Sequence, residues 1–189
     1  MSIKGLGVCL SLTTVFLVAA ATPQQAFGEH PGSHSQQQHS GDLVRIVRDS
    51  TRRFLDVRKA EAEGYGLLFG CVSGPDDGAM GLHYVNMALV ADPTLDPTRP
   101  EIVIYEPLPN GGRRLIGADF LVFSADWHAS NTGTPQIMGQ LMHLIESPNR
   151  YGLPAFYTLH VWAWKPSPTG VFVNWHSDVS CENYSATGQ

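Results

Sequence analysis

The stretch of sequence that says most about the fold lies near the C-terminus and reads NRYGLPAFYTLHVWAW, residues 149–164. Residues 155–164 are rich in aromatic and β-branched side chains, which predicts a β-strand. Because side chains alternate faces along a strand, Thr158, His160, Trp162 and Trp164 are expected on one face. That face is either a binding surface or one side of a core that contains a hydrogen-bonded histidine.

The chain around this strand shows the pattern of an antiparallel β domain. After Gly64, Gly and Pro recur at roughly 8-to-12-residue intervals, as turns do between short strands. The sequence Pro-Asn-Gly-Gly at 109–112 predicts a hairpin. Segments 91–100 and 124–139 read as loops. The expected strands are 67–71, 82–89, 101–105, 114–123, 142–146, 155–164 and 171–173.

One helix is predicted before the sheet, over residues 42–62. Asp42 can cap its N-terminus and Gly64 ends it. An apolar stripe runs along the segment, and the opposite face is basic and reads as solvated. The stripe consists of Leu43, Ile46, Val47, Phe54, Val57 and Ala60. The predicted fold class is α+β, with this helix packed on a curved antiparallel sheet or small β-barrel.

The N-terminus has the features of a secretory signal peptide over residues 1–28. Lys4 is its only charge, an apolar run follows, and small residues suited to cleavage lie at 19–21 and 26–28. The alternative is a retained membrane anchor, although the run is short for a bilayer span. We expect a secreted or periplasmic protein.

Residues 29–41 read as a flexible Gln/Ser/His linker that precedes a single globular domain over 42–189. The segment lacks the apolar side chains that would offset the entropy of ordering it. Its histidines, His30, His34 and His39, form either a weak metal-scavenging tract or part of a solvated tether.

The cysteine count predicts a disulfide, and the net charge argues against two classes of partner. Removal of the signal peptide takes Cys9 away and leaves Cys71 and Cys181, an even pair that predicts a disulfide in an exported chain. The net charge of −5, about −6 without Lys4, argues against nucleic acid or an anionic membrane as partner.

Histidines in separate predicted strands suggest a metal site. Side chains from neighbouring strands can converge on one ion, and a carboxylate can complete the set. The candidate ligands are His83, Glu106, His143 and His160. A divalent transition metal such as zinc is the expected cofactor, with local structural roles for each histidine as the alternative. His128 and His176 are expected to be exposed.

Aromatic side chains provide a second candidate surface. Tyr84, Asn86, Trp162 and Trp164 are the residues expected to contact a small molecule or glycan, and the rings alternatively fill the core. The sequence contains no nucleophile elbow, phosphate loop or dinucleotide fingerprint.

Several blocks of this sequence resemble a group of exported bacterial proteins without an assigned activity. The blocks are GAMGLHYVN at 78–86, the YEP of PEIVIYEP at 100–107, and residues 149–164. The resemblance spans about residues 50–181 and implies no reaction or cofactor. That group carries Trp-Asn-Pro near its end where this chain has Trp175-His176-Ser177, which argues against an essential role for His176. His83, Glu106, His143 and His160 lie in or beside these blocks.

Two functions are consistent with these patterns. The first is an exported protein with a His/Glu-lined metal or small-ligand pocket, of hydrolytic or lyase type if it is an enzyme. The second is a non-catalytic envelope or extracellular module that binds a partner through an aromatic surface. An enclosed polar pocket would favour the first, and a contiguous exposed apolar patch the second.

Overall fold

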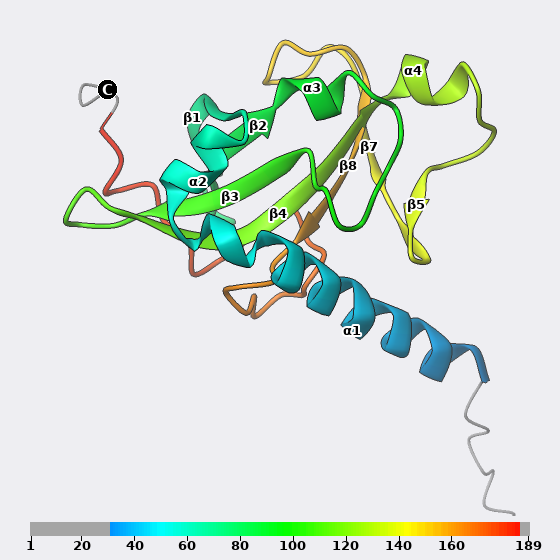
Figure 1. Cartoon of the computed structure of the whole chain (residues 1–189), viewed down its shortest axis with the longest axis horizontal. Coiled ribbons are helices and arrows are strands. Elements are labelled where there is room, and N and C mark those ends of the chain that lie inside the picture. Colours follow the sequence, from blue (N-terminus) through cyan, green and yellow to red (C-terminus); the bar gives the residue numbers. More distant parts are fainter. Residues whose placement is uncertain (1–30, 186–189) are drawn as a thin grey trace, which may run out of the picture. The chain divides into compact units, whose positions relative to one another are not determined.

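The computed structural model describes residues 31–185, with side chains from residue 40 onward. Its central element is a six-stranded sheet in the order β1-β2-β3-β4-β8-β7 (Figure 1). All neighbouring strands in it are antiparallel. The strands are β1 Tyr65–Ser73, β2 Ala79–Asn86, β3 Ile102–Pro107, β4 Arg113–Phe123, β7 His143–Ile145 and β8 Phe156–Val161. The sheet is open, with β1 and β7 at its edges, so α+β is confirmed and the small-barrel alternative is wrong.

Most predicted strands are present, with ends that differ by a few residues from the predicted ones. No strand forms at 171–173. The second strand ends at Asn86 because its side chain accepts hydrogen bonds from the backbone of Ala88 and Leu89 and so caps α3 Met87–Val90. The segment 124–139 contains α4 Ser124–His128 and β5 Gln136–Ile137, and β5 pairs with β6 Gln140–Leu141. The hairpin at 109–112 joins β3 and β4 as predicted.

The N-terminal helical segment differs from the single predicted helix in its start and its continuity. α1 Pro31–Thr51 begins eleven residues before Asp42, so residues 31–41, assigned to the linker, are helical. The 3₁₀ helix η1 Arg52–Leu55 then leads to α2 Val57–Ala62, which Asp56 caps. Gly64, with a φ of 92°, terminates α2 as expected. The signal peptide prediction, residues 1–28, lies outside the described residues.

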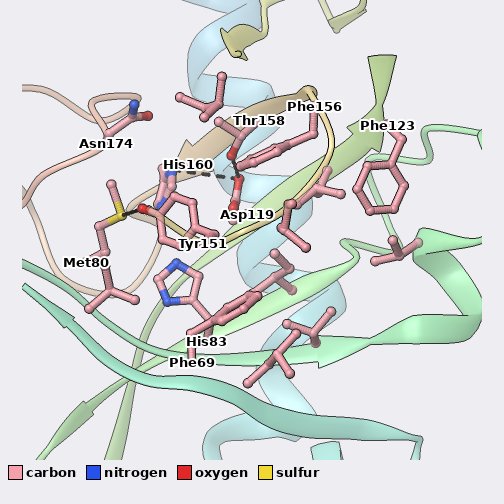
Figure 2. A pocket seen from close by; sticks show the side chains of 18 of the residues that line it. Phe69, Met80, His83, Asp119, Phe123, Tyr151, Phe156, Thr158, His160 and Asn174 are labelled. Carbon is pink, nitrogen blue, oxygen red and sulfur yellow. Dashed lines mark hydrogen bonds and ion pairs between the residues drawn. The ribbon is translucent and has the colours of Figure 1, made fainter. Parts of the chain in front are cut away.

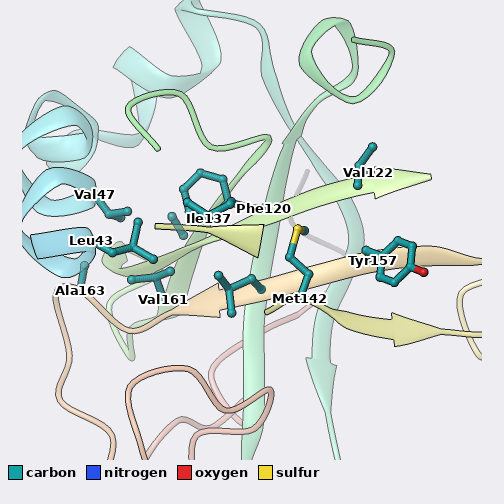
Figure 3. Packing of buried hydrophobic residues seen from close by; sticks show 11 residues of the cluster. Leu43, Val47, Phe120, Val122, Ile137, Met142, Tyr157, Val161 and Ala163 are labelled. Carbon is teal, nitrogen blue, oxygen red and sulfur yellow. The ribbon is translucent and has the colours of Figure 1, made fainter. Parts of the chain in front are cut away.

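One face of the sheet packs against these helices. Leu43 and Val47 of α1 are fully buried against Phe120 and Val161, as Figure 3 shows. Burial of each such aliphatic side chain contributes about 1.5–3 kcal/mol. A neighbouring cluster adds Phe54 and Ala60 beside Tyr84, Tyr105 and Val103. The predicted apolar stripe is therefore the surface that holds the helices on the sheet.

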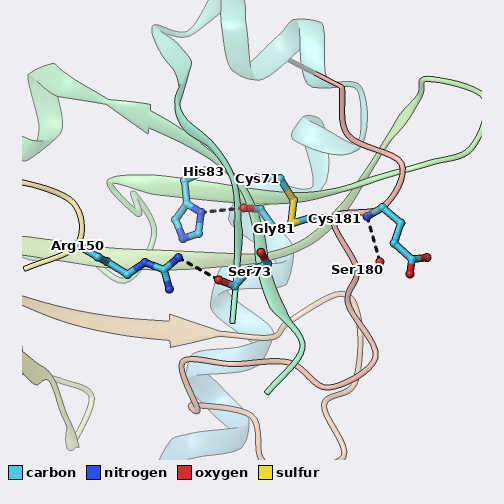
Figure 4. The surroundings of a disulfide bond; sticks show 8 residues. Cys71, Ser73, Gly81, His83, Arg150, Ser180 and Cys181 are labelled. Atoms are coloured by element: carbon cyan, nitrogen blue, oxygen red, sulfur yellow. Dashed lines mark hydrogen bonds between the residues drawn. A yellow bond between two sulfur atoms is a disulfide. The ribbon is translucent and has the colours of Figure 1, made fainter. Parts of the chain in front are cut away.

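The opposite face is covered by irregular chain. Leu153 and Val179, from two segments far apart in sequence, pack against Ile104 and Phe156 of the sheet. A disulfide joins Cys71 of β1 to Cys181 and fastens the C-terminal segment, which confirms the predicted pair (Figure 4). Within the described residues, no helix is both long enough and apolar enough to cross a membrane.

Candidate metal and ligand site

Strand register brings three ionisable side chains to the face of the sheet that the helices do not cover. Asp119 of β4 is the direct cross-strand partner of His160 of β8. Asp119 also pairs with Ile102, and His83 of β2 pairs with Ile104, two residues further along β3. Because residues two apart share a face, His83, Asp119 and His160 point to the same side of the sheet.

These three side chains form a compact buried group (Figure 2). One potential ligand atom from each lies within 4.8 Å of the others. His160 Nδ1 is 3.7 Å from Asp119 Oδ1, and the two imidazole rings are 5.7 Å apart between centroids. All three residues are at least 93% buried. Ligands of a tetrahedral metal lie about 3.4 Å from one another, so the spacing of this group is near that of a coordinating set.

His83 is oriented by the backbone of its own strand. Its Nδ1 lies 3.2 Å from the carbonyl oxygen of Gly81, and because a carbonyl only accepts, Nδ1 carries the proton. This leaves Nε2 as the atom with a free lone pair. Metal-binding histidines commonly donate their other ring N–H to a backbone carbonyl in this way. Gly81 has a φ of 90°, and a Cβ there would lie 2.6 Å from the oxygen of Tyr105, so glycine is required.

Asp119 is held by two hydrogen bonds to the same carboxylate oxygen. Thr158 Oγ1 donates to Oδ1 over 2.6 Å, and the backbone N–H of Leu159 donates over 3.1 Å. Among the described residues, no hydrogen bond reaches Oδ2. The carboxylate is therefore fixed in orientation with one oxygen available to a ligand.

Neither ring nitrogen of His160 makes a hydrogen bond of good geometry within the described part of the chain, and the candidate partner beside it is the side chain of Asn174. Its ring packs against the indole of Trp162, with centroids 5.6 Å apart. The side chain of Asn174 lies beside it (Figure 2), and Asn174 Oδ1 is also without a partner in residues 31–185. Unpaired polar atoms in a protein interior are costly, so this arrangement favours either a hydrogen bond between these two side chains or a ligand that pairs them.

Burial shifts the protonation of all three groups. It lowers the pKa of His83 to about 4, assisted by the charge of His160. It also lowers the pKa of His160 to about 3, with a further contribution from His143 and against the opposing effect of a hydrogen bond with Asn174. Burial raises the pKa of Asp119 to about 6, against the opposing effect of the Thr158 hydrogen bond. At neutral pH the imidazoles are neutral and the carboxylate is largely ionised, which are the states that bind a metal.

A cavity of about 80 Å³ adjoins this group. Its polar lining is confined largely to His83, Asp119, Thr158, His160 and Asn174, and most of the remaining wall is apolar. That volume exceeds the roughly 10–15 Å³ that one water requires. A ligand in this cavity can therefore have its polar end at the His/Asp group and its apolar part against the wall.

The structure brings together only two of the four predicted ligands, His83 and His160. Glu106 lies at the far end of β3, where Lys165 Nζ donates to its carboxylate over 2.7 Å and Arg114 donates as well. Burial is the largest single influence on the pKa of Glu106 and raises it. The hydrogen bonds and charges of the two cations together outweigh burial, so the pKa lies below its usual range. His143 is on edge strand β7 opposite Thr158 and is exposed. Neither belongs to the compact group.

The predicted small-molecule contacts do not line the cavity. Tyr84 is buried on the helix-covered face, and Asn86 caps α3. Trp162 is 2% exposed and fills the core behind His160. Trp164 does not share a face with His160, because β8 ends at Val161 and the chain turns there. Its indole N–H donates to Thr51 of α1 over 2.9 Å.

Of the two other histidines, one has the predicted exposure and one does not. His128 is exposed as expected, and its Nε2 lies 3.0 Å from the hydroxyl of Tyr157. His176 was predicted to be exposed but is fully buried, because its ring packs edge-on against Trp162 at 5.0 Å and its Nδ1 accepts the Asp178 N–H.

Asp119 is the site residue that the sequence patterns did not identify. A signal for it is present in the sequence, since Asp119 is the only charged residue from Leu115 to Phe123. A single carboxylate in an otherwise apolar strand must find partners when the strand is buried.

The chain matches no protein-family model, no curated protein and no solved structure. The chemistry therefore has to be inferred from the group itself. Two imidazoles and one carboxylate are a ligand set typical of zinc and of non-haem iron, and three protein ligands leave coordination positions open.

Proposed function

We propose that this protein binds one divalent transition metal, with zinc the first expected, through His83, Asp119 and His160. The observation that supports this most directly is the buried His160 ring, whose nitrogens make no well-formed hydrogen bond in the described chain and lie beside a carboxylate and a second imidazole. A metal would satisfy that ring and neutralise the buried carboxylate at the same time.

Such a site would be suited to binding and polarising a small ligand. The open coordination positions would be next to the cavity, where a bound water or a ligand oxygen has access to the metal. A metal lowers the pKa of bound water and polarises carbonyl groups, which supports the hydrolytic or lyase-type chemistry expected from the sequence. The enclosed polar group favours this function over a purely aromatic binding surface.

We further propose that the protein acts outside the cytoplasm. The signal-peptide pattern of residues 1–28 supports export. The Cys71–Cys181 disulfide is compatible with the oxidising conditions of a periplasm or extracellular space.

Metal titration tests the proposed site. Protein stripped with a chelator is titrated with Co²⁺, monitored by visible absorption, and metal content is measured after dialysis. We expect one ion per chain, and loss of binding in Asp119→Asn and in His160→Gln. Thermal unfolding of both variants verifies that they are folded.

His143→Ala is the matched control, because this histidine is near His160 but exposed and outside the group. It should bind Co²⁺ as the unmodified protein does. Absence of stoichiometric binding, or equal loss in the His143 variant, would contradict the proposed site.

A further inference from the structure

The cavity wall includes an irregularity in edge strand β1. The pairing with β2 shifts between Leu68 and Cys71, and the two residues in between have left-handed φ values, 65° for Phe69 and 66° for Gly70. A bulky residue rarely adopts this conformation, and such backbone tends to occur near functional sites. The irregularity places Phe69 against Tyr151, with ring centroids 5.7 Å apart, at the wall of the cavity (Figure 2).

Several large apolar side chains of the cavity wall are also exposed to solvent. Leu68 is 38% exposed, Phe69 45% and Met87 58%, and all three line the cavity. Exposed apolar side chains at the rim of an apolar cavity are typical of an entry route for an apolar ligand. Val85, Leu121 and other apolar residues line the same cavity together with the His/Asp group.

The charges inside the cavity limit which charge the polar end of a ligand can carry. Among the described residues that line it, none is Lys or Arg. With a divalent ion, two neutral imidazoles and the Asp119 carboxylate, the site would carry one net positive charge. Because a buried charge requires a counter-charge, a ligand with a single negative charge is favoured. Rotation of the Asn174 amide would present its NH₂ group to a second ligand oxygen.

We infer that the ligand class of this site is a short-chain aliphatic carboxylate, with the carboxylate on the metal and the alkyl chain in the apolar cavity. This inference rests on the proposed metal site. The volume of about 80 Å³ is roughly half that of an engineered 150 Å³ cavity that holds benzene, which limits the chain to a few carbons. Each methylene that leaves water should tighten binding by about fourfold.

Titration of the Co²⁺-loaded protein with acetate, butyrate and hexanoate tests the inference. We expect each carboxylate to perturb the visible Co²⁺ spectrum, with affinity rising about fourfold per methylene until the cavity is filled. The metal-free protein should show no comparable binding, because nothing then compensates the charge of the carboxylate.

Two tryptophan variants on β7 provide a matched pair. Ile145 lines the cavity, whereas its neighbour Leu144 points to the opposite side of the strand and is 43% exposed. Ile145→Trp should fill the cavity and remove the dependence on chain length, and Leu144→Trp should leave it intact. The Co²⁺ spectrum of each variant verifies that the metal site is folded.

The outcomes separate the two proposals. Failure of Co²⁺ to bind would overturn the metal site and this inference with it. Normal Co²⁺ binding with equal affinity for acetate and hexanoate would overturn the ligand class alone. Equal binding of hexanoate with and without metal would also overturn it, since the carboxylate would then not be on the ion.

Discussion

Asp119 Oδ1 and His160 Nδ1 lie 3.7 Å apart as direct cross-strand partners of β4 and β8. Both side chains are almost completely buried. The sheet therefore holds a carboxylate and an imidazole together in an interior where an unpaired charge would be strongly disfavoured.

Metal affinity should increase steeply with pH up to about pH 6 and then level off. Asp119, with a pKa of about 6, must lose its proton to bind a metal, so affinity should rise about tenfold per pH unit below that value. The pKa values of His83 and His160, about 4 and 3, make their protons weak competitors above pH 5. Calorimetry in buffers of different ionisation enthalpy should detect one proton released at pH 5 and almost none at pH 7.5. A tenfold rise per unit continuing from pH 6 to 8 would contradict this assignment.

Thr158→Val should weaken metal binding by about 10- to 100-fold, as loss of a group that orients a metal ligand does. The variant removes the 2.6 Å hydrogen bond to Asp119 and should raise the pKa of that carboxyl further. Thr158→Ser retains the hydroxyl and is the control. Co²⁺ titration at pH 6 and pH 8 gives the measurement, and a Val variant that binds as tightly as the Ser variant would show that the hydrogen bond does not support the site.

Glu101 should make the protein less stable as the pH rises. It is 1% exposed, accepts a hydrogen bond from the Leu121 N–H, and has its pKa raised by burial to about 8. Because the folded-state pKa exceeds the unfolded value of 4.5, its favourable contribution is complete below pH 4.5 and is lost as the pH rises to about 8. The expected slope is about −1.4 kcal/mol per pH unit within that range.

Glu101→Gln removes this titration while keeping the shape of the side chain. Urea unfolding of both proteins between pH 5 and 8 should give a difference in the free energy of unfolding that grows with pH in favour of the variant. Parallel pH profiles would show that Glu101 does not titrate in this way.

The disulfide should contribute substantially to stability. Cys71 and Cys181 are 110 residues apart, and closing a loop of that size disfavours the unfolded chain by about 4–5 kcal/mol in the chain-entropy model. The Cys71→Ser/Cys181→Ser variant should unfold at a lower urea concentration than the oxidised protein. Reductant should destabilise the unmodified protein and leave the double variant unchanged. Equal urea midpoints of unfolding for the oxidised protein and the double variant would contradict a stabilising role of the disulfide.

Alternation along strands was sufficient to predict part of the site. It placed Thr158 and His160 on one face of β8, where the structure has them both on the cavity side. It failed for Trp164 because the strand ends at Val161, where Ala163 N donates to Val161 O and the chain turns. Gly117 permits that turn to approach β4, since a Cβ there would lie 2.7 Å from the Val161 oxygen.

The composition of the group depended on strand order, which the sequence alone did not determine. Glu106 lies on β3 and Asp119 on the neighbouring strand β4, but only Asp119 is opposite His160. Glu106 instead lies near Lys165, a residue that the turn after β8 brings to it. Local patterns thus predicted that Thr158 and His160 share a face, whereas the choice of partners followed from pairing between distant segments.

The most direct test of the metal site is a crystal structure of Co²⁺- or Zn²⁺-loaded protein with anomalous diffraction collected at the absorption edge of the metal. We expect one anomalous peak per chain, about 2.0–2.2 Å from His83 Nε2, a carboxylate oxygen of Asp119 and a ring nitrogen of His160. A metal located elsewhere, such as at His143 or Glu106, or no peak in protein soaked at saturating metal, would contradict it.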